Sequence, residues 1–501
     1  MNKFIDGLKE TNEFGYTENG AVKRTTTHSK LLDMFSQGAA KRNADESDII
    51  HMFKEAYNED PLYALKCLFY IRDILGGQGE RRFFRICIHW LAKNDPEVVK
   101  RNLKNIPEYG RYDDLYALVG TPVEDDMWAL MRHQLRLDLW SETPSLLAKW
   151  MKSENTSSAE SRALGNKTRR AMGLSHRQYR KALSILRERI NIVERLMSEN
   201  QWDKIQFDKI PSRAGMIYKN AFARRDIIKE KYRKFASDPT TKVNAKTLYP
   251  YDCVVAARRD KYKDYIDPER LMTDKYWDNL TDYFNGASFN GMAIVDTSYS
   301  MCGYGNSVAP IDVAISLGLY CADKAAGPFH NYFMTFESNP HFVEVHGHDF
   351  VEKVANAMDA EWGGSTNIQG AFDLMLNTAI KNHCSPDEIP ENLIVISDME
   401  FNMCTYSNGN GWGGSRIKYL TPDATLFEKI KAEWAAHGYK MPKLIFWNVD
   451  ARSNNIPMRD DGYVNYVSGF SPVLFEQIMK GLTAYDLMMD KLNSERYAAV
   501  K

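Results

Sequence analysis

The chain has 501 residues, of which 44% are apolar and 26% charged, and its formal net charge is −1. This composition is typical of a soluble globular protein and excludes a fibrous or wholly disordered chain, while the length indicates two or more domains. Because the charge is almost balanced, any affinity for nucleic acid must come from a local basic patch.

The seven cysteines are scattered along the chain and form no Cys-x-x-Cys pair. That pattern argues against a zinc site and against a disulfide framework, so we expect a reducing compartment. The N-terminal residues lack an apolar signal core, and no stretch is apolar enough to span a membrane. We therefore expect a cytoplasmic protein with no membrane partner.

Residues up to about 285 show a helical spacing of apolar positions almost throughout. Amphipathic segments joined by short polar turns occupy residues 47–60, 61–77, 80–94, 95–103 and 125–140. Such a series predicts an α-helical bundle or a solenoid of paired helices. We place this helical domain at residues 46–285, after an N-terminal extension of residues 1–45.

Residues 174–197 carry the clearest helical signal. Ser175 and Gln178 have the spacing of a capping box, in which each side chain bonds the backbone of the other residue. Apolar residues at helical spacing follow as one predicted buried stripe, made of Leu183, Leu186, Ile190, Val193 and Leu196.

From about residue 286 continuous apolar strands alternate with amphipathic helices. The predicted strands are residues 289–297, 329–338, 341–347, 391–399, 443–449 and 463–469, and the predicted helices are 308–325, 349–360, 367–382, 424–439, 472–481 and 484–498. This alternation predicts a largely parallel sheet with helices on both faces and one antiparallel edge strand at 341–347. The fold class is therefore α + α/β, with the sheet domain at residues 286–501.

Oxygen-bearing residues cluster where the predicted strands end. Asp296, Ser298 and Ser300 follow the first strand, Asp398 follows the strand of VISDME, and a Gly-rich loop delivers Thr366 just before a helix. Ligands of open α/β sheets bind at the carboxyl ends of the strands, and an all-oxygen donor set suits a hard cation. We expect Mg²⁺ there, with Mn²⁺ or Ca²⁺ as alternatives. The other interpretation is that each residue caps a strand or a following helix.

This set of residues resembles the metal-ion-dependent adhesion site of von Willebrand factor A domains. The resemblance implies that Ser298 and Ser300 bind the metal directly, that Thr366 binds directly or through water, and that the aspartates act largely through water. Tyr299 stands where that family usually has glycine, so its ring would crowd or gate the open coordination position. Residues 406–419 form either a lid over this site or an inserted loop.

A wider resemblance covers most of the chain beyond about residue 50. Together with the layout of a helical half followed by an A domain, the stretches GLSHRQYRKALSILRERINIVERLM, KIPSRAGMIYKNAFARRD and LIVISDMEF look like the DUF2828 family of uncharacterised proteins. The architecture is also similar to the Ro/TROVE RNA-binding proteins, whose helical-repeat ring carries an A domain. The resemblance implies a HEAT- or TROVE-like helical domain.

Residues 161–190 are the candidate nucleic-acid surface, with nine positive charges against the single acid Glu188. Cations would contact phosphates, and aromatic rings would stack on bases. The alternative is a solvated helix face. The candidate residues are Arg162, Lys167, Arg169, Arg170, His176, Arg177, Tyr179, Arg180 and Lys181.

The leading functional interpretation is a non-enzymatic, Ro-like binding protein. Its helical scaffold would bind RNA, such as a small non-coding RNA, or a protein, and its A domain would bind an acidic residue of a protein ligand through Mg²⁺. No small-molecule substrate and no catalytic residue are expected. The alternatives are a structural subunit of a larger assembly and a metal-dependent phosphoester hydrolase that uses Asp296, although Ser298 stands where such sites carry a second acid.

Overall fold

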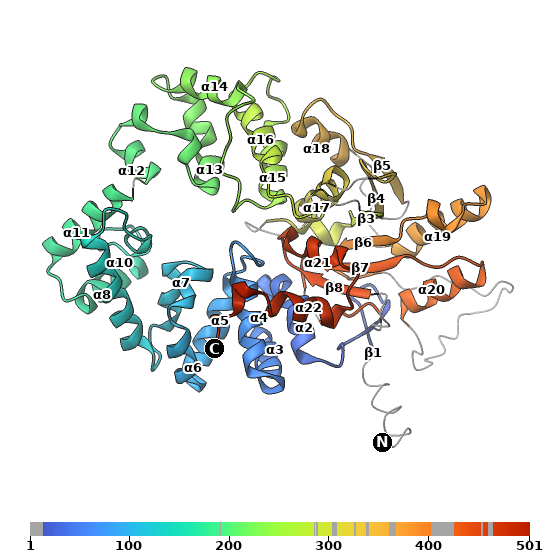
Figure 1. Cartoon of the computed structure of the whole chain (residues 1–501), viewed down its shortest axis with the longest axis horizontal. Coiled ribbons are helices and arrows are strands. Elements are labelled where there is room, and N and C mark those ends of the chain that lie inside the picture. The colour runs from blue at the N-terminus through green and yellow to red at the C-terminus, as the bar shows by residue number, and fades with distance from the viewer. Residues whose placement is uncertain are drawn as a thin grey trace.

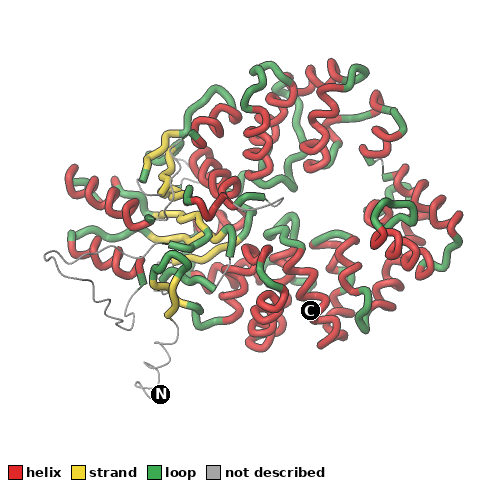
Figure 2. Tube along the Cα trace, turned by 180° about the vertical axis from the view of Figure 1, so that it is seen from behind, coloured by secondary structure: helices red, strands yellow, loops and turns green. Residues whose placement is uncertain are grey.

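The computed structural model describes residues 14–401 and 425–501, except 191, 285, 287–288, 303–307, 325–326, 337–339, 360–366, 452–453 and 459–463. A helical arc leaves one side of a sheet-containing domain and returns to its other side (Figure 1). Seen from behind, the strands gather in one part of the molecule, and the rest of the chain is helices and loops (Figure 2).

The N-terminal half is helical after a short β-hairpin, as the apolar spacing predicted. The hairpin is β1 (Phe14–Tyr16) and β2 (Val22–Arg24). The helices that follow are α2 (Lys30–Gln37), η1 (Gly38–Asn43), α3 (Glu46–Glu59), α4 (Pro61–Arg72), α5 (Arg82–Asn94), α6 (Pro96–Asn102), α7 (Asn105–Tyr109), η2 (Tyr112–Leu118), α8 (Glu124–Trp140), α9 (Leu147–Trp150), α10 (Ala159–Ala171), α11 (His176–Arg189), α12 (Val193–Ser198), η3 (Trp202–Lys204), η4 (Phe207–Lys209), α13 (Ser212–Arg224), α14 (Lys229–Ser237), α15 (Pro250–Asp260) and α16 (Pro268–Asp278). Among the described helices, none combines the length and the apolar character needed to cross a bilayer.

The predicted helix of residues 174–197 is two helices. The capping box at the start of α11 is confirmed, because Ser175 accepts from the Gln178 backbone and the Gln178 side chain accepts from the Ser175 backbone. The backbone of Ile192 is extended, so the helix is interrupted before α12 begins. A single apolar period continues across this break, which is why the sequence did not reveal it.

The second half contains one six-stranded sheet with helices between its strands. In chain order the elements are β3 (Gly291–Asp296), η5 (Tyr299–Cys302), α17 (Pro310–Lys324), β4 (Tyr332–Phe336), β5 (His341–Glu344), α18 (Phe350–Met358), α19 (Ile368–Asn382), η6 (Pro386–Glu388), β6 (Asn392–Ser397), α20 (Leu426–Ala436), β7 (Lys443–Asn448), β8 (Val464–Ser468), η7 (Pro472–Leu474), α21 (Phe475–Met479), α22 (Ala484–Leu492) and η8 (Glu495–Tyr497). The strand order is β5-β4-β3-β6-β7-β8, and only the β4–β5 pair is antiparallel. The predicted doubly wound sheet and its antiparallel edge are confirmed.

Helices cover both faces of this sheet, as two neighbouring residues of β7 demonstrate. The Trp447 ring lies 5.1 Å from the Phe475 ring of α21, and the Phe446 ring lies 4.7 Å from the Phe427 ring of α20. Successive strand residues point to opposite faces, so α20 and α21 pack on opposite sides. Both faces are therefore buried, which explains the continuous apolar strands in the sequence.

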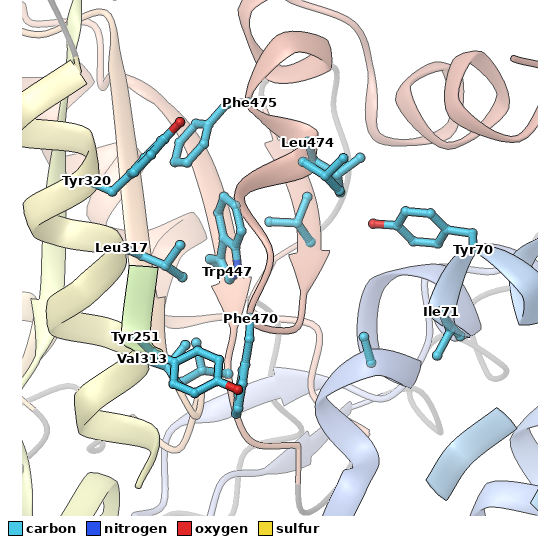
Figure 3. Close-up of a cluster of buried hydrophobic side chains, with 14 of the residues drawn as sticks. Tyr70, Ile71, Tyr251, Val313, Leu317, Tyr320, Trp447, Phe470, Leu474 and Phe475 are labelled. Atoms are coloured by element: carbon cyan, nitrogen blue, oxygen red, sulfur yellow. The ribbon is translucent and has the colours of Figure 1, made fainter. Parts of the chain in front are cut away.

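The helical half and the sheet domain share one hydrophobic core. Helix α15 packs on α17 and α18, while α2 packs on β8 and α4 packs on α22. Figure 3 shows side chains from both halves of the chain in one cluster, including Tyr70 of α4, Tyr251 of α15, Tyr320 of α17 and Trp447 of β7. Each end of the helical arc is thus anchored on the sheet domain.

Candidate functional site

The strand order reverses between β3 and β6, the two central strands. They run parallel, with Val295 opposite Ile396, so their carboxyl ends lie side by side. A crevice at such a reversal point is where open α/β sheets bind ligands. Asp296 ends β3 and Asp398 directly follows β6, so the structure brings these two predicted residues to this edge.

Asp296 is completely buried at the end of β3. One carboxylate oxygen accepts a hydrogen bond from the Ser298 backbone N–H at 2.9 Å, and the other accepts from the Ser397 hydroxyl at 2.5 Å. Burial raises the pKa of Asp296, and the hydrogen bonds from both serines oppose that shift. In the part of the chain that the structure describes, no lysine or arginine pairs with this carboxylate.

The two predicted serines lie in the turn after β3. The Ser298 and Ser300 hydroxyl oxygens are 3.0 Å apart, and Ser298 is buried. Their spacing places two hydroxyl oxygens together beside the buried carboxylate. Tyr299, which we predicted to crowd or gate the site, is 63% exposed and therefore faces solvent.

Asp398 is also buried, directly after β6. It accepts a hydrogen bond from the Glu400 backbone N–H at 3.1 Å, and Ser397 accepts from the Met399 backbone N–H at 2.9 Å. Met399 has a φ of 65°, a left-handed conformation that is uncommon outside glycine. The chain therefore turns sharply here and keeps Asp398 at the end of the sheet.

The observed contacts support part of the capping interpretation, because both aspartates close local turns. Those turns do not offset the charge of the buried Asp296 carboxylate, which a divalent cation would offset. Among the described residues, no group of three or more His, Cys, Asp and Glu side chains is arranged to hold a metal. A metal here would thus depend on serine hydroxyls, and this all-oxygen donor set fits Mg²⁺.

Two predicted parts of the site, Thr366 and the loop at residues 406–419, lie outside the described residues. Thr366 directly precedes Asn367, the N-cap of α19, whose side chain accepts a hydrogen bond from the Gly370 backbone at 3.1 Å. Helix α19 packs on β4, next to β3.

Several predicted nucleic-acid residues bind acids of the protein itself. The Lys167 ammonium lies 2.7 Å from Glu124. Arg169 and His176 both contact the Glu154 carboxylate, at 2.8 Å and 2.9 Å. These side chains connect α10 and α11 to neighbouring segments, so their first role is in the packing of the helical half.

The remaining predicted cations are exposed. Arg162 donates to two backbone carbonyls of the preceding loop, at 2.6 and 2.8 Å. Arg170, Arg177, Arg180 and Lys181 lie on the exposed sides of α10 and α11. We call these four the exposed cations; they are the ones that best fit the predicted phosphate contacts.

The prediction that Tyr179 stacks on a base is wrong for the folded protein. Its ring is 1% exposed, because it faces the core of the helical half, and its hydroxyl donates to the Lys152 carbonyl at 2.7 Å.

An exposed aromatic residue that the sequence reading missed is Trp140, the last residue of α8, at 92% exposure. Arg189 of α11 donates to the carbonyls of Leu139 and Ser141 on either side of it, at 2.9 and 3.2 Å. Trp140 lies off the apolar stripe of α8, and this position in the sequence could have predicted that its side chain is exposed.

Comparison with known proteins identifies the class of protein that this architecture represents. The helical half matches the family model described as "Domain of unknown function (DUF2828)" at residues 17–138 and 144–284. The sheet domain matches the model described as "Domain of unknown function (DUF7788)" at residues 290–498. The chain belongs to the DUF2828 family, as the sequence resemblance predicted.

Among individual proteins, the chain is similar to "Uncharacterized protein L728" of Acanthamoeba polyphaga mimivirus. The two are 32% identical over 512 residues, which cover 93% of this chain and 84% of the relative. The chain also matches the crystal structure of the Deinococcus radiodurans RO (RSR) protein over 93% of each chain, with a TM-score of 0.36 and 12% identity. A superposition this loose does not establish a common function.

Proposed function

We propose that the protein is a non-enzymatic binding protein whose sheet domain holds Mg²⁺ at the ends of β3 and β6. Asp296, Ser298, Ser300 and Asp398 would hold the metal, with Thr366 as a further ligand. Bound Mg²⁺ would offset the buried acidic charge and offer a coordination position to an acidic group of a partner. The observation that supports this most is the buried Asp296 carboxylate, whose only partners among the described residues are the uncharged Ser298 and Ser397.

The arrangement of hydroxyls supports binding rather than catalysis. The Ser298 hydroxyl is hydrogen-bonded to the Ser300 hydroxyl rather than to an imidazole that could deprotonate it. The Ser397 hydroxyl donates a hydrogen bond to the Asp296 carboxylate. Ser298 and Ser300 are thus suited to supply oxygen ligands to a metal rather than to act as nucleophiles.

Thermal unfolding of the full chain in MgCl₂ and in EDTA tests the metal proposal. Mg²⁺ at about 100 times its Kd should stabilise the wild type by about 2.7 kcal/mol, because it binds only the folded state. Asp296→Asn should lose that gain. In EDTA the variant should be at least as stable as the wild type, since it no longer buries an unpaired carboxylate.

The matched control is Asp490→Asn, at a half-exposed acid of α22. It should keep the Mg²⁺-dependent gain of the wild type. An equal Mg²⁺ response from Asp296→Asn and the wild type would refute the metal site.

We propose RNA binding by the helical half as a second activity. It is supported by the exposed cations of α10 and α11 together with the exposed indole of Trp140 in the same half of the chain. Guanidinium and ammonium groups neutralise phosphates, and an exposed ring stacks on unpaired bases. A single-stranded segment of a small RNA is the partner that suits both features.

The variant Arg170→Gln/Arg177→Gln/Lys181→Gln tests this proposal while keeping Arg169, which pairs with Glu154. Binding of a fluorescent single-stranded RNA oligonucleotide should weaken, and its salt slope should fall by about 2, because three phosphate contacts are lost. The control Lys242→Gln/Lys381→Gln/Lys429→Gln makes the same charge change at exposed positions elsewhere. Equal loss in both triple variants would indicate a non-specific charge effect and contradict the proposed surface.

A further inference from the structure

Residues near the start of the sequence form hydrogen bonds to the segment that carries Asp398. We call residues 398–401, which follow β6, the site turn. The Thr17 hydroxyl donates to the Phe401 carbonyl at 2.6 Å, and the Glu18 backbone N–H donates to the Glu400 carboxylate at 2.6 Å. The Asn19 side chain donates to the Glu400 carbonyl at 2.5 Å. The turn of the β1–β2 hairpin is therefore bonded to two successive residues of the site turn.

Charge strengthens this attachment. Glu400 is 1% exposed and Lys23 of β2 is 5% exposed, so both charged groups are removed from solvent. Burial lowers the pKa of Lys23, and the negative charge of Glu400 opposes that shift. An opposite charge nearby is what makes the burial of each group tolerable.

A second connection reaches the site turn through α2. The Asn455 side chain donates to the Met399 carbonyl at 2.5 Å, and the Asn455 backbone N–H donates to the Gln37 side chain at 3.2 Å. Met399 is the residue of the site turn whose backbone is left-handed. Hydrogen bonds from Asn455 thus hold the strained position of the turn and link it to α2.

The hairpin itself is fixed to the sheet domain near these contacts. Arg24 and Ile456 exchange backbone hydrogen bonds of 2.9 and 3.0 Å, and Arg24 forms an ion pair with Glu428 of α20 at 3.3 Å. The Phe401 ring of the site turn also lies 5.2 Å from the Phe427 ring of α20. The hairpin is therefore anchored independently of the bonds that it makes to the site turn.

We infer that the N-terminal segment of residues 14–44 is part of the candidate site. Asn19 of this segment, and Asn455, which bonds to Gln37 of the same segment, are positioning residues: their hydrogen bonds to the site turn fix the position of Asp398. This inference rests on the proposed metal site and assigns to the N-terminal segment a role in metal affinity. The side chains that orient a ligand, rather than the ligand alone, determine how well a metal site is preorganised.

The test compares the full-length wild type with Asn19→Ala and Asn455→Ala, using Tyr16→Phe as the control. Tyr16 lies on the same hairpin and is 58% exposed. Mg²⁺ affinity is measured by titration calorimetry, and backbone hydrogen exchange of residues 398–401 is measured without metal. Both variants should bind Mg²⁺ about tenfold more weakly, and both should exchange faster in the site turn. The control should match the wild type in both measurements.

The outcomes separate this inference from the function on which it rests. If the wild type binds Mg²⁺ and both variants bind equally well, the positioning role is overturned. If the wild type does not bind Mg²⁺, the proposed function fails, and unchanged exchange in the variants would then also show that the hairpin does not hold the site turn. Asn19 is exposed, so its variant keeps the fold; for Asn455, which is 4% exposed, the unfolding midpoint is measured first.

Discussion

Asp274 of α16 lies where the helical half meets the sheet domain. Its carboxylate accepts a hydrogen bond from the backbone N–H of Phe350, the first residue of α18, at 2.7 Å. Burial raises the pKa of Asp274 from 3.8 to about 7, with a further increase from the nearby Asp349 and Asp278, against the hydrogen bond from Phe350 and the attraction of Arg270. Between about pH 4 and about pH 7, the Asp274 carboxyl is therefore protonated in the folded protein and ionised in the unfolded chain.

Because the pKa of Asp274 is higher in the folded protein, the free energy of unfolding decreases as the pH rises from about 4 to about 7. Over this range the unfolded chain has already released the proton that the folded protein still binds. Asp274→Asn keeps an acceptor for the Phe350 N–H and removes the charge. The variant should unfold at a higher temperature than the wild type at about pH 8, with a smaller difference at about pH 5. A difference of the same size at both pH values would contradict the raised pKa.

Single residues of the candidate site could be predicted only where chemistry and chain order were enough. Asp296 and Asp398 were identifiable because each follows an apolar strand, and parallel strands bring their ends together. Ser397 was not, because its hydroxyl is significant only once the register places it against Asp296. The stacking role of Tyr179 failed because its phenol is amphipathic and the core buried it.

At the scale of elements, helix α17 packs closely on β3, the strand that ends in Asp296. A Cβ atom added at Gly318 of α17 would lie 2.6 Å from a methyl group of Val295, and both residues are buried. Val295 directly precedes Asp296, so this helix also supports the strand that carries the site. A stiff β-branched side chain on a central strand has little freedom to move aside.

Gly318→Val should therefore destabilise the protein by about 2–3 kcal/mol, because the overpacking outweighs the better helix propensity of valine over glycine. The free energy of unfolding in urea measures this. Ala435→Val, at an exposed position of α20, is the control and should change that free energy by less than about 1 kcal/mol. Equal effects would mean that the approach of α17 to β3 is not tight.

The long periodic elements of both halves were predictable because apolar period and length specify them locally. The β1–β2 hairpin was not, since it is short and its partners are residues such as Glu400 and Ile456, far away in sequence. The break between α11 and α12 was also missed, because the apolar stripe runs on through it. Elements that depend on long-range contacts are the ones that local patterns do not reveal.

The C-terminal residues of the chain bond to the helical half. Asp73, which follows α4, is buried and forms an ion pair with Arg496, whose second guanidinium nitrogen lies 2.5 Å away. The Tyr497 hydroxyl also donates to Asp73 at 3.0 Å. At the other end of the arc, Arg270 of α16 makes two bonds to Asp349, at 2.5 and 3.0 Å.

Arg496→Ala should lower the free energy of unfolding by about 1–3 kcal/mol, because it leaves a buried carboxylate without its cation. Urea unfolding followed by circular dichroism and by tryptophan fluorescence should still give coincident transitions, since the two halves share one core. The control Asp490→Ala breaks the half-exposed pair with Lys480 and should change stability by less than about 1 kcal/mol. Separate transitions for the two probes would contradict a single cooperative unit.

We claim that the ends of β3 and β6 form a divalent-cation site, and titration calorimetry of Mg²⁺ into the metal-free full chain measures this binding. We predict one binding event in the wild type, no binding in Asp296→Asn, and unchanged binding in Asp490→Asn. An absence of Mg²⁺ binding in the wild type, or equal binding in Asp296→Asn, would contradict the claim. The cluster would then be a set of structural turns that close the ends of two strands.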